Sequence, residues 1–265
     1  MHNMRSVKNI VCFILLLIIS TSCSEEKNGT EKIEAKNKSE KIVDKPVLNT
    51  NLPQESLDNN LDTLHIKNKI YHLHEISKKY FSQIPPANSL KTKSDLKNVS
   101  YQDSTSITFS LSNGLDTTFT NNYEDGWENY SVYEVIKDYD EINCWLVYIG
   151  LYEGDAMFLL NKNSGKVLWV YSEPILSPSK KYFVAHSGDL EAGYNSNGIQ
   201  LFKIQGANVV EIWTKDIAEW EPSEVKWEND STIAIKQTFF NWDNPEEFYI
   251  YKYKTMKVIN MHNRN

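Results

Sequence analysis

Acidic, amide and aromatic residues gather in three short polar segments in the second half of the chain. The segments read LYEGDA, SGDLEAGYNSNG and TFFNWDNPEE, and each follows a short apolar run. Carboxylate and amide oxygens are the ligands that Ca²⁺ prefers in proteins. The same groups beside an aromatic ring suit a sugar, because the ring offers a flat apolar face. The candidate ligand-binding residues in these segments are Tyr152, Glu153, Asp155, Asp189, Glu191, Tyr194, Asn195, Trp242, Asp243 and Glu246.

These residues predict neither a cofactor nor a catalytic group. Their spacing matches no EF-hand loop, so a Ca²⁺ site has no motif behind it and no metal site is expected. A pair of carboxylates could act in a glycosidase, but acidic residues are common here and no pair stands out. His186 lies near Ser177 and Ser187 in the sequence, without the nucleophile elbow that would support a triad. The plainer interpretation is that the three segments are solvated turns of an acidic protein.

The three segments occupy the same place in a repeated pattern. A predicted strand precedes each segment and a predicted hairpin follows it. The hairpins start at Ala156, Ile199 and Phe248, 43 and 49 residues apart, and the third is expected to turn near Lys254 and Thr255. A repeat of this length that contains strands is typical of propeller blades. Equivalent loops of such units should lie together at one end of the sheets. The repeat units are expected at residues 130–174, 175–220 and 221–261.

One segment of the repeat resembles a known family. The run Ser177-Pro178-Ser179-Lys180 is similar to the Ser-Pro-Asp-Gly-Lys segment of propeller repeats of the WD40 or TolB type, with Ser179 in place of Asp and Lys180 in place of Gly. The resemblance covers about residues 130–260 and implies a sheet architecture and no activity. A closed ring usually needs four blades, which residues 99–140 would complete. We therefore expect an all-β, propeller-like stack of antiparallel hairpins, with a β-sandwich or an open sheet stack as the alternative.

Residues 61–84 begin the expected all-β domain at 61–265 with an ambiguous pattern. Apolar residues recur at spacings of three and four from Ile66 to Ile84, which favours a helix. The alternative is a hairpin that turns at Lys67–Lys69. His72 and His74 would point to the same side only on a strand, so we expect structural or solvent-facing histidines rather than a metal site.

The N-terminus has the three-part layout of a secretory signal. Arg5 and Lys8 are followed by an apolar run from Ile10 to Ile19, by small residues and by Cys23. This stretch resembles the lipobox of bacterial lipoproteins, although Ser20 stands where that family usually has Leu. The resemblance implies cleavage after residue 22 and a lipid on Cys23, which would anchor the chain to a membrane.

The segment after Cys23 predicts a tether. Residues 23–60 are rich in Lys, Glu, Asn and Ser and nearly lack aromatic residues, so they are expected to be disordered. Such a segment would have a root-mean-square reach of about 30 Å. Ser24, Glu25 and Glu26 resemble the surface-export signal of Bacteroidetes lipoproteins. The expected location is the bacterial cell envelope, at the periplasmic or the surface leaflet of the outer membrane.

The net charge and the cysteine content narrow the range of possible partners and reactive groups. The formal net charge is −7, and cleavage would lower it further by removing Arg5 and Lys8, which argues against nucleic acid as a partner. Cys144 would be the one unmodified cysteine of the cleaved chain, and its apolar neighbours predict a buried, inert thiol. We therefore predict a lipid-anchored, non-enzymatic module that binds a protein or a glycan. The alternatives are a hydrolase of envelope glycan or polymer that uses loop carboxylates, and a structural accessory of an outer-membrane assembly.

Overall fold

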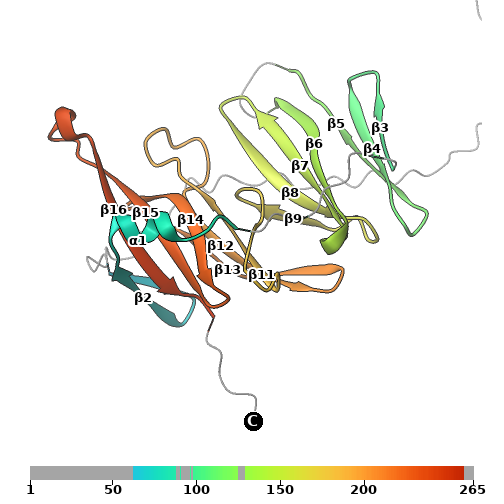
Figure 1. Ribbon diagram of the computed structural model, residues 1–265. Helices are drawn as coiled ribbons and strands as arrows, with labels where there is room; N and C mark the ends of the chain where they lie inside the picture. The colour runs from blue at the N-terminus through green and yellow to red at the C-terminus, as the bar shows by residue number, and fades with distance from the viewer. Residues whose placement is uncertain (1–61, 88–89, 91–95, 97, 125–128, 260–265) are drawn as a thin grey trace, which may run out of the picture. The chain divides into compact units, whose positions relative to one another are not determined.

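A computed structural model describes residues 62–87, 90, 96, 98–124 and 129–259 of the chain. The predicted signal peptide, Cys23 and the predicted tether lie outside these residues. Within them the chain is all-β, with sixteen strands in four antiparallel sheets (Figure 1). The all-β prediction is confirmed, and the sheets are open rather than closed into a barrel.

Two of the sheets are four-stranded meanders in which each strand pairs with the next one along the chain. The first contains β6 (Ser131–Tyr139), β7 (Cys144–Leu151), β8 (Gly154–Asn161) and β9 (Val167–Val170). The second contains β10 (Ile175–Leu176), β11 (Tyr182–Ser187), β12 (Gly198–Gln205) and β13 (Asn208–Asp216). The polar segments 151–156 and 187–198 therefore connect the second and third strands of their sheets.

The third sheet is a meander of three strands to which two strands from residues 63–75 are added. Its strands are β14 (Glu221–Asn229), β15 (Thr232–Phe240) and β16 (Tyr249–Lys257). The hairpin predicted to turn near Lys254 and Thr255 is wrong, because β16 runs straight through both residues. Strand β2 (Lys69–Glu75) takes the place of the missing fourth strand, and β1 (Thr63–Ile66) pairs with β2.

The helix favoured from Ile66 to Ile84 is wrong for its first part, where the alternative hairpin is correct. Strands β1 and β2 join at a tight turn, where Lys67 adopts a left-handed φ of 54°. Burial explains the outcome: Leu64, Ile66 and Leu73 are buried, whereas Ile70 is 57% exposed. A helix would have placed Ile70 on the buried stripe. Helix begins only at α1 (Lys78–Gln83), which Ser77 caps by accepting a hydrogen bond from the backbone N–H of Tyr80.

The last sheet lies earlier in the chain and contains β3 (Val99–Gln102), β4 (Ser106–Ser110) and β5 (Asp116–Thr120). Strands β4 and β5 form the hairpin that the Asn113-Gly114 pair predicts. Gly114 adopts a φ of 81°, a left-handed conformation that favours glycine.

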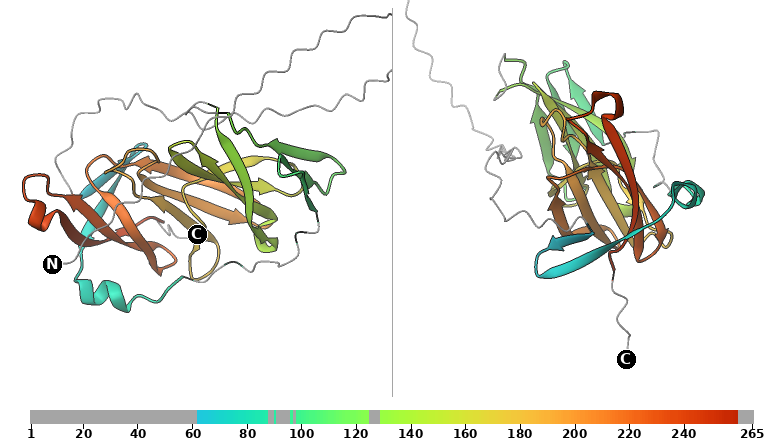
Figure 2. Two further views of the ribbon diagram at one scale, coloured as in Figure 1. Left: turned by 90° about the horizontal axis from the view of Figure 1, so that it is seen from above. Right: turned by 90° about the vertical axis from the view of Figure 1, so that its left-hand side faces the viewer.

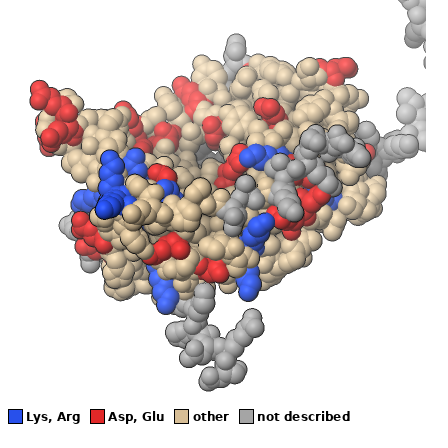
Figure 3. Space-filling view, viewed as in Figure 1, with Lys and Arg blue, Asp and Glu red and all other residues tan. Residues whose placement is uncertain are grey.

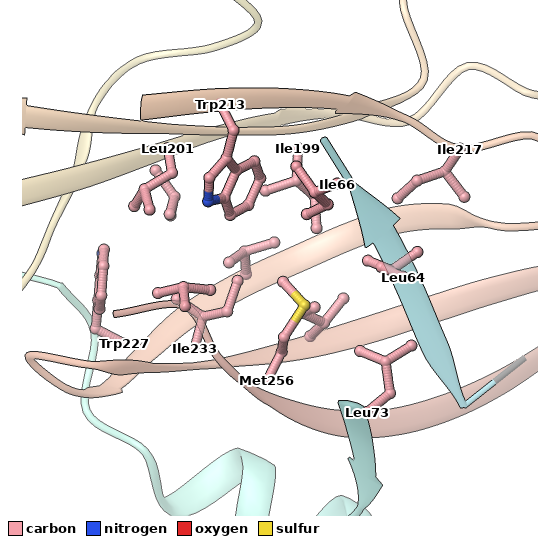
Figure 4. Packing of buried hydrophobic residues seen from close by; sticks show 14 of the residues in the cluster. Leu64, Ile66, Leu73, Ile199, Leu201, Trp213, Ile217, Trp227, Ile233 and Met256 are labelled. Carbon is pink, nitrogen blue, oxygen red and sulfur yellow. The ribbon is translucent and has the colours of Figure 1, made fainter. Parts of the chain in front are cut away.

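Buried apolar clusters join neighbouring sheets. The largest lies between the β10–β13 sheet and the sheet that contains β14–β16, where Trp213 and Leu201 face Trp227, Ile233 and Met256 (Figure 4). A second cluster joins the β6–β9 and β10–β13 sheets, and a third joins the β3–β5 and β6–β9 sheets. Helix α1 packs on the opposite face of the β14–β16 sheet, through Phe81 and Ala234 (Figure 2). These clusters hold the sheets that carry the three polar loops.

Candidate functional site

The three polar segments form the connections β7–β8, β11–β12 and β15–β16. The first is a tight turn at Tyr152 and Glu153, both of which are exposed. The second spans residues 188–197, and the third spans residues 241–248. One hydrogen bond connects the β7–β8 turn to the β11–β12 loop, and another connects the β11–β12 loop to strand β16.

The first connection joins the β7–β8 turn to the β11–β12 loop. The backbone N–H of Asp155 donates to the side-chain oxygen of Asn195 at 2.8 Å. Gly154 permits this approach, since a Cβ atom there would lie 2.7 Å from the same oxygen and 3.1 Å from the carbonyl oxygen of Tyr194. The structure therefore brings Asp155, Tyr194 and Asn195 together, as the repeat predicts for equivalent loops.

Asp189 holds the β11–β12 loop in its fold. One of its carboxylate oxygens accepts hydrogen bonds from the backbone N–H groups of Tyr194 at 2.9 Å and Asn195 at 2.6 Å. Asn197 fixes the far end of the loop, because its side-chain amide donates to the carbonyl oxygens of Ile217 at 2.6 Å and Trp220 at 2.9 Å. Asp189 thus acts on its own loop, and its side chain positions the Asn195 that receives Asp155.

The second connection joins the β11–β12 loop to the β14–β16 sheet. The hydroxyl of Tyr249 donates to a carboxylate oxygen of Glu191 at 3.3 Å. Glu221 supports the same loop by accepting from the backbone N–H of Leu190 at 2.6 Å. The negative charges of Glu191 and Glu221 contribute to raising the pKa of the Tyr249 hydroxyl above its ordinary value.

Asp155 carries a partly buried carboxyl group at the contact between the first two loops. Partial burial raises its pKa above the ordinary value, and the nearby charge of Asp189 adds to the effect. A hydrogen bond from Tyr148 works in the opposite direction. Among the described residues, no three His, Cys, Asp or Glu side chains are placed to hold a metal ion. We call the β7–β8 turn and the β11–β12 loop the braced loops, because these hydrogen bonds hold them, and the Asp155 carboxyl group with its raised pKa lies where they meet.

A row of aromatic rings begins where these loops end. We define the aromatic ribbon as Phe240, Trp242, Phe248, Tyr249 and Tyr251, on the β15–β16 hairpin. Neighbouring ring centroids lie 4.9 to 6.5 Å apart, and the Tyr249 and Tyr251 rings are nearly parallel, at 13°. Trp242 is 66% exposed, Tyr249 49% and Tyr251 48%. The hairpin extends beyond its neighbours in the sheet (Figure 1), so these rings face solvent.

Charge is divided along the same hairpin. Asp243, Glu246 and Glu247 are exposed at its tip, where acidic side chains gather in Figure 3. Lysines lie in the middle of the hairpin: Lys236 places its Nζ atom 4.3 Å from the centroid of the Tyr251 ring, and Lys252 places its Nζ atom 4.8 Å from that of Phe239. Asp243 and Glu246 therefore belong to this acidic tip and not to the braced loops.

Only part of the aromatic ribbon is among the candidate residues predicted from the sequence. Trp242 is a predicted candidate, whereas Phe240 lies in the third polar segment without being one, and Phe248, Tyr249 and Tyr251 fall in the predicted third hairpin. The available signal was the alternation of Tyr249, Tyr251 and Tyr253, which places three rings on one face of a strand. The predicted third hairpin hides this signal, because a turn at Lys254 would end the strand soon after Tyr253.

Two hollows in the described surface lie away from the braced loops, on the α1 side of the β14–β16 sheet. One, of about 340 Å³, is lined by Phe81 of α1 and by Tyr251 and Tyr253. The other, of about 410 Å³, is lined by residues that include His72 and His74 of β2. Both histidines are exposed, as expected, and their ring centroids lie 6.5 Å apart on the same strand face.

The thiol of Cys144 is buried, and the histidine inside the repeats, His186, is half-buried. Burial raises the pKa of Cys144 to about 12, which keeps the thiol protonated and unreactive. Burial lowers the pKa of His186, whose backbone N–H donates to Ser172 at 3.1 Å. The predicted burial of Cys144 is confirmed, its raised pKa agrees with the expectation of an inert thiol, and His186 is a packed strand residue.

Comparison with protein-family models, with curated proteins and with solved structures finds no match to this chain. None of the helices that the structure describes is long and apolar enough to cross a membrane.

Proposed function

We propose that the chain is a lipid-anchored, extracytoplasmic binding module that contacts its partner through the aromatic ribbon. The observation that carries the proposal is the exposure of Trp242, Tyr249 and Tyr251 in one continuous row. Large aromatic side chains rarely remain exposed together on a soluble domain unless they contact a partner. Tryptophan and tyrosine are also the residues that dominate binding energy at interfaces.

The partner is an envelope glycan or an envelope protein. The exposed rings of Tyr249 and Tyr251 offer apolar surface against which a sugar ring can pack, and the Tyr hydroxyls and the Lys236 ammonium group beside Tyr251 supply polar contacts. The acidic tip argues against nucleic acid, because its carboxylates would repel phosphate groups. The resemblance of the N-terminus to a lipobox supports an anchor at Cys23 and a place on the outer membrane, in either leaflet.

The alternative function is hydrolysis of an envelope glycan, and the raised pKa of Asp155 is the observation that favours it. A carboxyl group with a raised pKa can act as a general acid. The other candidate carboxylates support binding better, since Asp189 accepts two backbone N–H groups and Glu191 accepts a tyrosine hydroxyl. Both functions use the same end of the sheets, so one experiment separates them.

The experiment compares the wild-type chain with Trp242→Ala and Tyr251→Ala, and with Tyr101→Ala as the matched control. Tyr101 is 54% exposed on β3, in a different sheet. Cosedimentation with isolated envelope polysaccharide and capture of envelope proteins measure binding, and release of reducing sugar measures hydrolysis. We expect each ribbon variant to lose about tenfold or more in affinity while the control binds normally. Equal binding by all four proteins would refute the proposal, and sugar release that Asp155→Asn abolishes would establish the hydrolase.

A further inference from the structure

The β14–β16 sheet has an edge that its own chain leaves open. Strand β2 pairs with β16 only at Lys254, Thr255 and Met256, and the chain then departs toward α1 after one more bond, from the N–H of Ile76 to the carbonyl oxygen of Tyr253 at 2.9 Å. On its other side, β16 pairs with β15 along its whole length, up to Tyr249. The described residues therefore provide no strand beside residues 249–252.

Two backbone hydrogen bonds, one at each end of this stretch, show which backbone groups face the open edge. The carbonyl oxygen of Tyr253 points away from β15, toward Ile76, whereas that of Phe248 accepts from the N–H of Asn241, which follows β15. Backbone groups of a strand alternate between its two edges. Tyr249 and Tyr251 therefore direct their N–H and C=O groups outward, in the position of a strand that another chain could extend.

We propose that a second copy of this chain pairs with this edge, so that the two β14–β16 sheets form one continuous sheet across a two-fold axis. Antiparallel pairing of the outward groups sets Tyr249 of each copy opposite Tyr251 of the other, and Ile250 opposite Ile250. The proposal does not depend on the proposed function, because it uses backbone groups and charges rather than a glycan or an envelope partner.

Charge along the hairpin selects a second copy in this orientation. The tip of the β15–β16 hairpin carries Glu246 and Glu247, and the middle of the hairpin carries Lys236 and Lys252. Antiparallel pairing about Ile250 places the acidic tip of each copy beside the lysine-bearing middle of the other. In the register given above, Lys252 lies opposite Phe248 of the second copy, next to Glu247 of that copy. The complementarity occurs twice, once on each side of the axis.

The tyrosine rings agree with the same arrangement. Tyr249 and Tyr251 lie on the same face of β16, and pairing would bring Tyr249 of one copy beside Tyr251 of the other on that face. The two short rows would become one row across both copies. Cross-strand aromatic pairs stabilise antiparallel sheets, so the exposed rings gain contacts when the edge closes.

The first test is a disulfide at the axis, in the full-length chain. Opposed residues outside the narrow hydrogen-bonded pairs have Cα atoms about 4.5 Å apart, within the range that a disulfide spans. Ile250→Cys should therefore give a covalent dimer as the main product of mild oxidation. Val210→Cys is the matched control, because Val210 is 46% exposed on β13, away from this edge. Wild-type protein measures the background from the natural cysteines.

The second test exchanges charges, and sedimentation velocity measures the dissociation constant. Glu247→Lys alone should raise that constant about tenfold, since it places a repelling pair on each side of the axis. Adding Lys252→Glu should restore association, which a general loss of folding would not allow. Tyr251→Ala, which keeps the backbone groups, should weaken glycan binding more than dimer formation. A monomeric wild type, or equal crosslinking of the Ile250→Cys and Val210→Cys variants, would overturn the proposal and leave the proposed function standing.

Discussion

Asp189 offers the sharpest test of whether the loop carboxylates serve structure or chemistry. Its carboxylate accepts two backbone hydrogen bonds, at 2.9 and 2.6 Å, that no other side chain replaces when it is shortened to alanine. A hydrogen bond to a charged group contributes about 1.5–3 kcal/mol when buried, and the half-buried position of Asp189 lowers this to about 1 kcal/mol each. Asp189→Ala should therefore lower the free energy of unfolding by about 2 kcal/mol, which lowers Tm by about 4–8 °C in a domain of this size.

The matched control is Asp243→Ala, because Asp243 is exposed at the tip of the β15–β16 hairpin. The free energy of unfolding of Asp243→Ala should stay within about 0.5 kcal/mol of the wild-type value. Hydrogen exchange gives a local readout: in Asp189→Ala, the backbone amides of Tyr194, Asn195 and Asp155 should exchange faster, since Asn195 receives the Asp155 N–H. The pKa of Asp155 should also fall, because the charge of Asp189 helps to raise it. If both variants unfold at the same denaturant concentration with unchanged exchange, the loop is not held by Asp189 and the reasoning fails.

Three further changes test other parts of the fold. Asp155→Asn should stabilise the protein at neutral pH, because folding raises the pKa of Asp155 and so disfavours the ionised carboxylate that the wild type carries there. The advantage should disappear as the pH falls toward 3.8, where the wild-type carboxyl group is protonated in the folded state. Urea unfolding at several pH values measures this difference. Lys162→Met should lower the free energy of unfolding by about 3–5 kcal/mol, because it leaves the buried Asp138 carboxylate without its cation, and adding Asp138→Asn should recover part of the loss in the same assay. Gln237→Met should raise the free energy of unfolding by about 1–3 kcal/mol, since both side-chain amide atoms of Gln237 are buried without a partner among the described residues. A lower free energy of unfolding would show that ordered water bonds the amide.

The sequence was informative where strands pair with their neighbours along the chain. The polar connections at 151–156, 187–198 and 238–247 all fall between strands that pair directly, so their place in the repeat could be inferred from apolar runs alone. The contact between the first two loops followed from that equivalence, whereas the expectation that the third loop joins them is wrong, because residues 241–248 form the tip of the extended β15–β16 hairpin. The bonds that brace them did not, because a contact such as Asp155 with Asn195 spans two sheets and carries no periodic signal.

The failures have a common physical cause, which is pairing between distant parts of the chain. Met256 pairs with Leu73, far away in the sequence, and this partner is what keeps β16 straight where a hairpin was predicted. The same pairing buries Leu73 and exposes Ile70, which turned a helical stripe into a strand. Spacing within a segment cannot distinguish these outcomes, since the partner that decides between them lies outside the segment.

The length of β2 determines how much of β16 remains available. Because β2 ends at Glu75 and the chain turns away after Ile76, residues 253–256 of β16 have a partner on this edge and residues 249–252 have none in the part of the chain that the structure describes. A longer β2 would satisfy the backbone groups of Tyr249 and Tyr251 and place a strand beside their rings. An exposed edge is a liability that proteins usually blunt with charges, proline or a covering element. Here the described edge carries aromatic residues at its centre, with acidic and basic residues at opposite ends. This pattern discourages pairing with arbitrary strands and favours one register with its own copy.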